Sequence, residues 1–130
     1  LAEHFLFKDN HINAYRKFFP KARLGEIIRK AGAFKRHIPV EIEVENLAQF
    51  QEVLSAGAGI IMLDNMPLAD MRKAVSLLKR SPVKTRPELE VSGGVSLETV
   101  KKLAALGIGR ISIGKLTHSA PALDFSLEIE

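Results

Sequence analysis

Short apolar runs alternate along the chain with longer segments in which apolar residues recur at helical spacing. The short runs, which are typical of buried strands, are Phe5–Lys8, Val40–Val44, Ile60–Leu63, Leu89–Val91 and Arg110–Ile113. The longer segments carry one apolar stripe each, which is typical of a helix with one buried face; they centre on 47–54, 71–78 and 100–106. Strands that alternate with helices predict an α/β fold with a parallel sheet and crossover helices.

Residues between these segments agree with the expected helix ends. Asn46 and Gln49 have the spacing of a capping box, Ser96 is a favourable N-cap, and Pro67 suits a first helical turn. Glycine commonly follows the last turn of a helix. On that basis we expect helices to end at Gly32, Gly57 and Gly107.

Segment 46–64 also resembles segment 96–114 at a constant shift of 50 residues. A shift of 50 residues corresponds to the length of two βα units. Five strands suffice for a doubly wound open sheet, whereas a closed βα barrel needs about eight. The pattern therefore leaves two architectures open, an open sheet or part of a barrel.

Composition bounds the class of protein. The chain has 130 residues, of which 46% are apolar and 26% charged, which suits one globular domain. It contains no cysteine, which excludes disulfides, thiolate metal sites and a cysteine nucleophile. No apolar run approaches the roughly 20 residues that span a bilayer, and no signal peptide is recognisable, so we expect a cytoplasmic protein without a membrane partner. The net charge of +4 comes from scattered basic residues without an aromatic stacking platform, and we expect no nucleic-acid partner.

Polar residues gather where the expected strands end, which is where both architectures bind ligands. The second strand differs, because it carries Glu41, Glu43 and Glu45 at alternate positions of one face. If the apolar residues between them face the helices, these carboxylates face a barrel interior. The other strand ends run into the polar groups Lys8-Asp9-Asn10-His11, Asp64-Asn65, Ser92-Gly93-Gly94 and Gly114-Lys115-Leu116-Thr117-His118.

The combination of these groups is more informative than any one of them, since each alone suits a turn, a helix cap or a solvated strand end. A Ser-Gly-Gly loop after the next-to-last strand matches the phosphate site often found in βα barrels, because glycines let backbone N–H groups approach phosphate oxygens at a helix N-terminus. Lys8 suits an anionic carboxylate or phosphate. Glu43 and Asp64 suit a ribose diol, or Mg²⁺ that bridges to a pyrophosphate. Together they predict a site for a phosphorylated sugar and a second anion.

Five motifs in order resemble the quinolinate phosphoribosyltransferases (carboxylating nicotinate-nucleotide pyrophosphorylases). The motifs, which cover nearly the whole chain, are FLFKDNHI at 5–12, EIEVEN at 41–46, IMLDNM at 61–66, EVSGGV at 90–95 and ISIGKLTHS at 111–119. The resemblance implies that residues 1–130 are the C-terminal part of a βα-barrel catalytic domain, with about five strands and an incomplete barrel. It also implies an enzyme of NAD biosynthesis that converts quinolinate and phosphoribosyl pyrophosphate to nicotinic acid mononucleotide, pyrophosphate and CO₂, with Mg²⁺ as cofactor.

The resemblance also implies roles for single residues. Lys8 would be catalytic and bind a quinolinate carboxylate. Glu43 and Asp64, also catalytic, would hold the ribose hydroxyls or the Mg²⁺-bound pyrophosphate and stabilise a positive C1. The 5′-phosphate would be bound by Ser92, Gly93, Gly94 and Gly114, with His118 nearby.

Some parts of the family pattern are not found in this chain. Family members carry an N-terminal sandwich domain and the first barrel strands, which supply further basic groups, and they take an arginine from a dimer partner. We therefore expect the chain alone to be incomplete, and the full-length enzyme to form a homodimer or a larger oligomer. The stretch Asn13–Pro39 is longer than usual, with the added residues expected in the first helix or its flanking loop, and Lys115 replaces a small residue.

Two other functions stay open at this point. A non-catalytic fragment that binds only the phosphosugar would share every motif. A phospho-acceptor receiver domain would explain the string IMLDNMP at 61–67, with Ser92 and Lys115 as its switch groups. The receiver explains neither Glu43 nor the Ser-Gly-Gly loop, and its first strand lacks the usual acidic pair.

Overall fold

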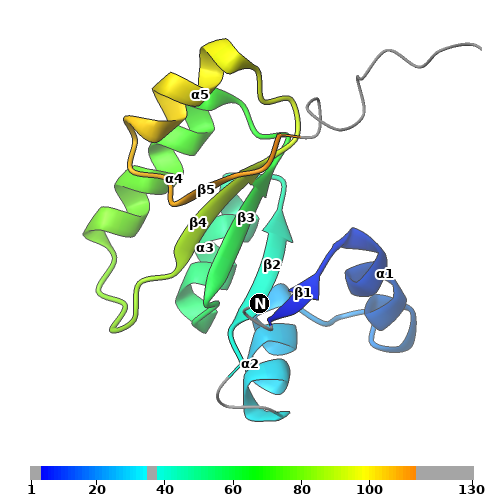
Figure 1. Cartoon of the computed structure of the whole chain (residues 1–130). Helices are drawn as coiled ribbons and strands as arrows, with labels where there is room; N and C mark the ends of the chain where they lie inside the picture. Colours follow the sequence, from blue (N-terminus) through cyan, green and yellow to red (C-terminus); the bar gives the residue numbers. More distant parts are fainter. Residues whose placement is uncertain (1–3, 35–37, 114–130) are drawn as a thin grey trace, which may run out of the picture.

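Parallel strands alternate with helices through residues 4–34 and 38–113, the part of the chain that the computed structural model describes (Figure 1). The elements are β1 Phe5–Phe7, α1 Asp9–Phe18, α2 Leu24–Phe34, β2 Val40–Val44, α3 Leu47–Ala56, β3 Ile60–Asp64, α4 Leu68–Arg80, β4 Glu88–Ser92, α5 Leu97–Ala104 and β5 Arg110–Ile111. The five strands and the three stripe-bearing helices predicted from the sequence are confirmed. None of the helices in this part of the chain is long and apolar enough to cross a bilayer.

The order of the strands decides between the two architectures. All five strands are parallel and lie in the order β1-β2-β3-β4-β5, so that each strand pairs with the next one along the chain. A doubly wound sheet reverses its order at a switch point, and this sheet does not. The fold is therefore a run of βα units in the arrangement of a barrel, which also argues against the receiver domain.

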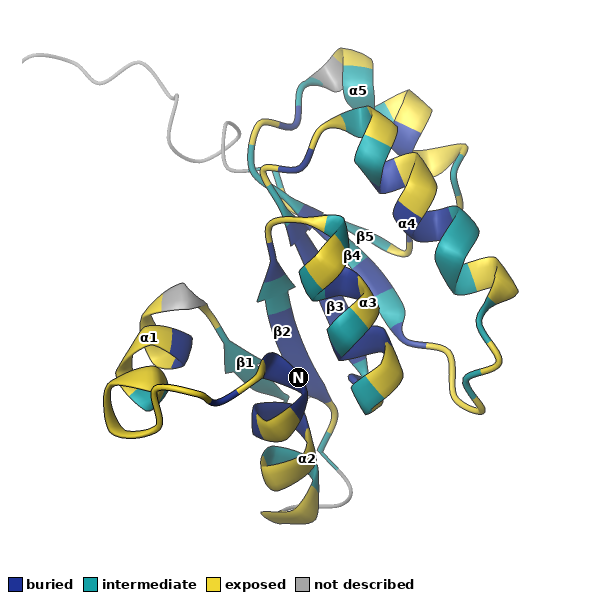
Figure 2. Cartoon of the chain, turned by 180° about the vertical axis from the view of Figure 1, so that it is seen from behind, coloured by how far each residue is buried: buried dark blue, intermediate teal, exposed yellow. Residues whose placement is uncertain are grey.

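One face of the sheet packs against the helices (Figures 1 and 2). In register, Ile42 of β2 lies beside Ile61 of β3, which lies beside Leu89 of β4. These residues join one apolar core with buried residues of four helices, among them Ile28 in α2, Phe50 in α3, Met71 in α4 and Leu103 in α5. Because α2, α3, α4 and α5 contribute to the same core, they cover the same face.

The opposite face carries the alternate residues of each strand. On β2 these are Glu41 and Glu43, and on β4 they are Glu88 and Glu90. This confirms the prediction for Glu41 and Glu43, which lie opposite the helices, whereas Glu45 follows the end of β2. The β3 residues between them, Ile60 and Met62, are buried but do not belong to the apolar core.

The connection from β1 to β2 contains two helices, α1 and α2, where one had been expected. The expectation that a helix ends at Gly32 is wrong, because α2 continues to Phe34. Gly32 lacks the left-handed conformation of a helix-ending glycine, and the alanines on either side of it favour a helix.

The repeat of 50 residues is confirmed in three dimensions. The helices α3 and α5 begin at Leu47 and Leu97, and the strands β3 and β5 begin at Ile60 and Arg110. Gly57 and Gly107 both adopt left-handed backbone angles, with φ of 85° and 80°. Both segments therefore have the same arrangement of a helix, a left-handed glycine and a strand.

Candidate functional site

The predicted site residues lie at one edge of the sheet. Lys8 follows β1, Glu43 is the second-to-last residue of β2, and Asp64 and Ser92 end β3 and β4. Asp64 and Ser92 are direct neighbours in the strand register. Parallel strands in sequential order bring their carboxyl ends together, so the fold places these four residues along one edge. Gly114, Lys115 and His118 lie outside the described residues.

The Ser-Gly-Gly loop is a turn that only glycines fit well, and the side chain of Asn65 packs closely against it. Gly93 and Gly94 have φ of 77° and 61°, both in the left-handed region that favours glycine. A Cβ atom on Gly93 would collide with the side chain of Asn65. The glycine at 93 is therefore required both by its backbone angle and by this neighbour.

Asn65 connects the loop after β3 to the loop after β4. Its backbone N–H donates to the carbonyl of Ser92 at 3.0 Å, and its Nδ2 donates to Oδ2 of Asp64 at 2.9 Å. Asn65 itself has a positive φ of 49°, which asparagine tolerates better than most residues. The amide thereby orients the Asp64 carboxylate. Sequence reasoning had placed Asn65 only among the polar residues at the strand ends, because its contact with Gly93 comes from strand pairing.

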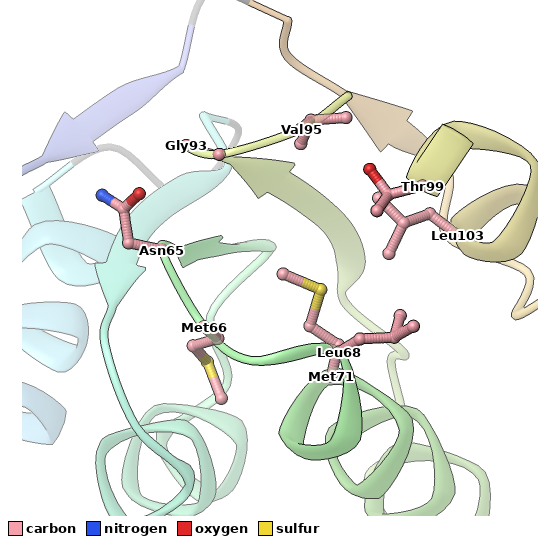
Figure 3. A pocket seen from close by; sticks show the side chains of 9 residues that line it. Asn65, Met66, Leu68, Met71, Gly93, Val95, Thr99 and Leu103 are labelled. Atoms are coloured by element: carbon pink, nitrogen blue, oxygen red, sulfur yellow. The ribbon is translucent and has the colours of Figure 1, made fainter. Parts of the chain in front are cut away.

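A small cavity of about 180 Å³ lies between these two loops and the helices α4 and α5 (Figure 3). Asn65 and Gly93 line its mouth, and Met71 and Leu103 line its apolar interior. None of the residues lining it carries a charge. An anion at this mouth would therefore meet the backbone of the glycine loop rather than a basic side chain.

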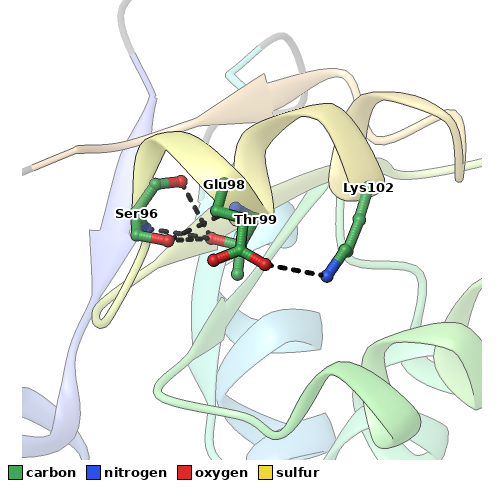
Figure 4. Close-up of polar contacts among 4 residues, drawn as sticks. All are labelled: Ser96, Glu98, Thr99 and Lys102. Atoms are coloured by element: carbon green, nitrogen blue, oxygen red, sulfur yellow. Dashed lines mark hydrogen bonds and ion pairs between the residues drawn. The ribbon is translucent and has the colours of Figure 1, made fainter.

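The first turn of α5 is held by a reciprocal cap (Figure 4). Ser96 Oγ accepts from the N–H of Thr99 at 3.3 Å, and Thr99 Oγ1 accepts from the N–H of Ser96 at 2.9 Å. This confirms the predicted N-cap. The cap keeps the helix N-terminus, which favours negative charge, directly after the glycine loop.

At the other end of the edge, Lys8 is the N-cap residue of α1 and is exposed. Its backbone N–H donates to Nδ1 of His11 at 3.4 Å, and the His11 ring lies edge-on to Phe7 with a centroid separation of 6.4 Å. The backbone of Lys8 is thus held while its ammonium group stays accessible.

Glu41 is the most buried charged residue among the described ones, with 2% of its surface exposed. Its Oε2 lies 2.5 Å from Nε2 of His4. Burial raises the pKa of the Glu41 carboxyl, and the nearby Glu90 raises it further, while His4, Arg110 and Lys8 act in the opposite direction. Sequence reasoning placed Glu41 on the correct face but did not foresee its partner, which comes from before β1.

Other carboxylates on this face pair with a basic side chain or accept a hydrogen bond. Arg110 on β5 lies 2.9 Å from a carboxylate oxygen of Glu88 and 3.9 Å from one of Glu90. Ser112 Oγ lies 2.6 Å from the other oxygen of Glu90, to which it donates. Sequence reasoning missed this group, although the alternation of Glu88 and Glu90 with apolar residues was a signal for it.

The chain is similar to known proteins over nearly its whole length. Residues 1–128 match the family model described as "Quinolinate phosphoribosyl transferase, C-terminal domain". The chain is 36% identical over 129 residues to a probable nicotinate-nucleotide pyrophosphorylase (carboxylating) of Archaeoglobus fulgidus, and the match covers 99% of this chain and 47% of that protein. It is 37% identical to a tobacco protein, "Quinolinate phosphoribosyltransferase (decarboxylating) 2a, mitochondrial" of Nicotiana tabacum, covering 96% of this chain and 38% of that one.

Solved structures give the same result. A nicotinate-nucleotide pyrophosphorylase from Ehrlichia chaffeensis superposes with a TM-score of 0.75 at 32% identity, over 92% of this chain and 39% of that chain. NadC from Streptococcus pyogenes superposes with a TM-score of 0.72 at 37% identity, over 98% and 41% of the two chains. The chain thus spans less than half the length of these relatives.

Proposed function

The chain belongs to the quinolinate phosphoribosyl transferase family, as a C-terminal domain, and on this premise we propose that it carries the phosphoribosyl pyrophosphate site of such an enzyme. The reaction would convert quinolinate and phosphoribosyl pyrophosphate to nicotinic acid mononucleotide, pyrophosphate and CO₂. The observation that carries the proposal is the shared edge, where Lys8, Glu43 and Asp64 lie at the strand ends beside the glycine loop.

The 5′-phosphate is assigned to the loop Ser92-Gly93-Gly94. Two consecutive left-handed glycines leave backbone N–H groups unshielded by side chains, and α5 begins a few residues later. Gly114 and His118 complete this subsite in the proposal, on the strength of the motif alone.

The ribose and the pyrophosphate are assigned to Glu43 and Asp64. Mg²⁺ is usually bound by one or two carboxylates together with substrate phosphates, which is what Glu43 and Asp64 would supply. When bound, Mg²⁺ would neutralise charge on the leaving pyrophosphate.

Catalysis of this reaction would depend mainly on how the chain positions the two substrates and on the charges that it places beside them. The ring nitrogen of quinolinate forms a bond to C1 while the bond from C1 to pyrophosphate breaks. The neighbouring carboxylate then leaves as CO₂, and the ring carbon takes up a proton. Lys8 would hold a quinolinate carboxylate, and the carboxylates of Glu43 and Asp64 would stabilise the positive charge that develops at C1.

The full-length protein would act as a homodimer or larger oligomer in the cytoplasm. A second candidate is a phosphosugar-binding chain without catalysis. It would use the same glycine loop, whose two left-handed glycines at 93 and 94 suit a phosphate without any catalytic group.

Calorimetric titration of the chain with phosphoribosyl pyrophosphate and Mg²⁺, then with quinolinate, tests the proposal. We expect saturable heat with the sugar, and K8A should weaken quinolinate binding while leaving ribose 5-phosphate binding intact. Heat with the sugar alone would support the second candidate. Failure of the chain to bind either substrate would contradict both.

A further inference from the structure

A second pocket, of about 180 Å³, opens where β2 ends. Glu43 and Glu45 line it from β2 and the residue after it, and Asn13 and Arg16 line it from α1. Gln49 of α3 closes the polar part, while Ile12 and Leu24 supply the apolar wall. The pocket thus joins Glu43, a residue already assigned to substrate, to Asn13 and Arg16 of α1, which lie beyond the Lys8-Asp9-Asn10-His11 group considered in the sequence analysis.

The rotation of α1 about its axis places Arg16 at this pocket. Ile12 is 6% exposed and belongs to the apolar core. At about 100° per residue, Arg16 projects only about 40° from Ile12, whereas Lys17 projects about 140° away. Burial of Ile12 therefore turns Arg16 toward β2 and Lys17 away from it.

Contacts with α2 hold α1 in this rotation. The rings of Tyr15 and Phe19 stack with their centroids 4.8 Å apart. Lys30 of α2 donates to the Tyr15 hydroxyl at 2.6 Å and lies over both rings, 5.3 Å and 4.9 Å from their centroids. Since Tyr15 adjoins Arg16, the contacts of Tyr15 with Phe19 and Lys30 also fix the backbone at Arg16.

Arg16 itself is exposed, and the structure gives it no ion pair with a described residue. Two carboxylates and one guanidinium around a pocket suit a ligand that presents both signs of charge. A magnesium–pyrophosphate group does so, because the cation suits carboxylates and the phosphate oxygens suit the planar fork of an arginine.

We propose that Arg16 binds the pyrophosphate group of the substrate whose ribose or Mg²⁺ is held by Glu43. The inference rests on the proposed function. It adds a binding residue from α1, within the stretch 13–39 that is longer than usual for the family. Asn13, less than one turn before Arg16, would donate to the same group or orient it.

The test uses two probes on the intact chain, magnesium pyrophosphate and ribose 5-phosphate, each titrated calorimetrically. We expect R16A to weaken pyrophosphate binding by about tenfold or more, the usual loss for a hydrogen bond to a charged group, and to leave ribose 5-phosphate binding unchanged. R16K should restore binding only in part, because a lysine lacks the fork. K17A is the matched control and should change neither affinity beyond about twofold.

Each other outcome overturns the inference. Equal affinities of R16A and K17A for pyrophosphate would show that Arg16 does not bind it, and a parallel loss of both ligands in R16A would indicate a structural role. If the unaltered chain binds ribose 5-phosphate but not pyrophosphate, the inference about Arg16 fails while the phosphate site stands. If it binds neither, the proposed function fails as well.

Discussion

The two faces of the sheet are built from the same strands and differ in almost every property. On the helix-facing side Ile42, Leu63 and Val91 have no exposed surface and pack in one apolar core. On the other side the same strands carry carboxylates, which lie beside His4 and Arg110. Because successive side chains of a strand point to opposite faces, one face can supply the stabilising core while the other carries the charged groups.

Burial alone does not distinguish the two faces. Glu41 is 2% exposed and Met62 is 7% exposed, values that would suit a core. Neither residue belongs to the apolar cluster. What distinguishes them is the neighbours, since one face is covered by helices and the other by charged side chains.

We expect the largest difference in the free energy of unfolding between substitutions at two neighbouring buried residues of β3. Leu63→Ala leaves a cavity in the core between sheet and helices, and we expect it to lower the free energy of unfolding by about 3–4 kcal/mol. Met62→Ala, on the other face, should lower it by about 1–2 kcal/mol, because flexible polar neighbours can fill the space. Urea denaturation of both variants measures the difference. Equal losses would contradict the separation of the two faces.

A second pair of substitutions compares a glycine of the candidate site with one at a helix end. Gly93→Ala must displace the Asn65 side chain as well as strain the backbone, and we expect a loss of about 2 kcal/mol and weaker phosphate binding. Gly107→Ala has a similar φ of 80° with nothing within 4 Å of the added carbon, so backbone strain alone should cost about 1 kcal/mol. Melting curves and ribose 5-phosphate titrations check both. If the two variants behave alike, Asn65 does not support the loop.

The smallest effect concerns Glu41 and depends on pH. Its folded-state pKa lies above the ordinary 4.5, chiefly because of burial. An acid with a raised pKa disfavours the folded state once ionised, so its unfavourable contribution grows as pH rises through the interval between 4.5 and the raised value. E41Q, which cannot ionise, should therefore be more stable than the unaltered chain at neutral pH, by less than about 1 kcal/mol.

Thermal unfolding across a pH series measures this effect. The advantage of E41Q should vanish below pH 4.5, where the unaltered side chain is protonated in both states. Glu98→Gln, on the exposed side of α5, is the control and should give no gain at neutral pH. An advantage of E41Q that persists unchanged in acid would contradict the assignment to ionisation.

Local patterns predicted most of the elements and the edge that carries the candidate site. Apolar runs located the strands to within one or two residues, and the caps at Asn46 and Ser96 were correct because capping is decided over three or four residues. The choice between an open sheet and a barrel depended on which strands pair, which no local pattern contains. For the same reason the contact between Asn65 and Gly93, the approach of His4 to Glu41 and the position of Arg16 emerged only in three dimensions.

The central claim is that substrate binds at the carboxyl ends of the strands, and NMR tests it most directly, residue by residue. Amide nitrogen–proton NMR spectra of the chain would be recorded while phosphoribosyl pyrophosphate and Mg²⁺ are added. If the substrate binds at the carboxyl ends of the strands, the amide signals of Lys8, Asn65, Gly93 and Gly94 should shift. Gly59 and Gly109, which precede β3 and β5 at the opposite edge, should stay in place. Shifts confined to that opposite edge, or no shifts at saturating ligand, would contradict the claim.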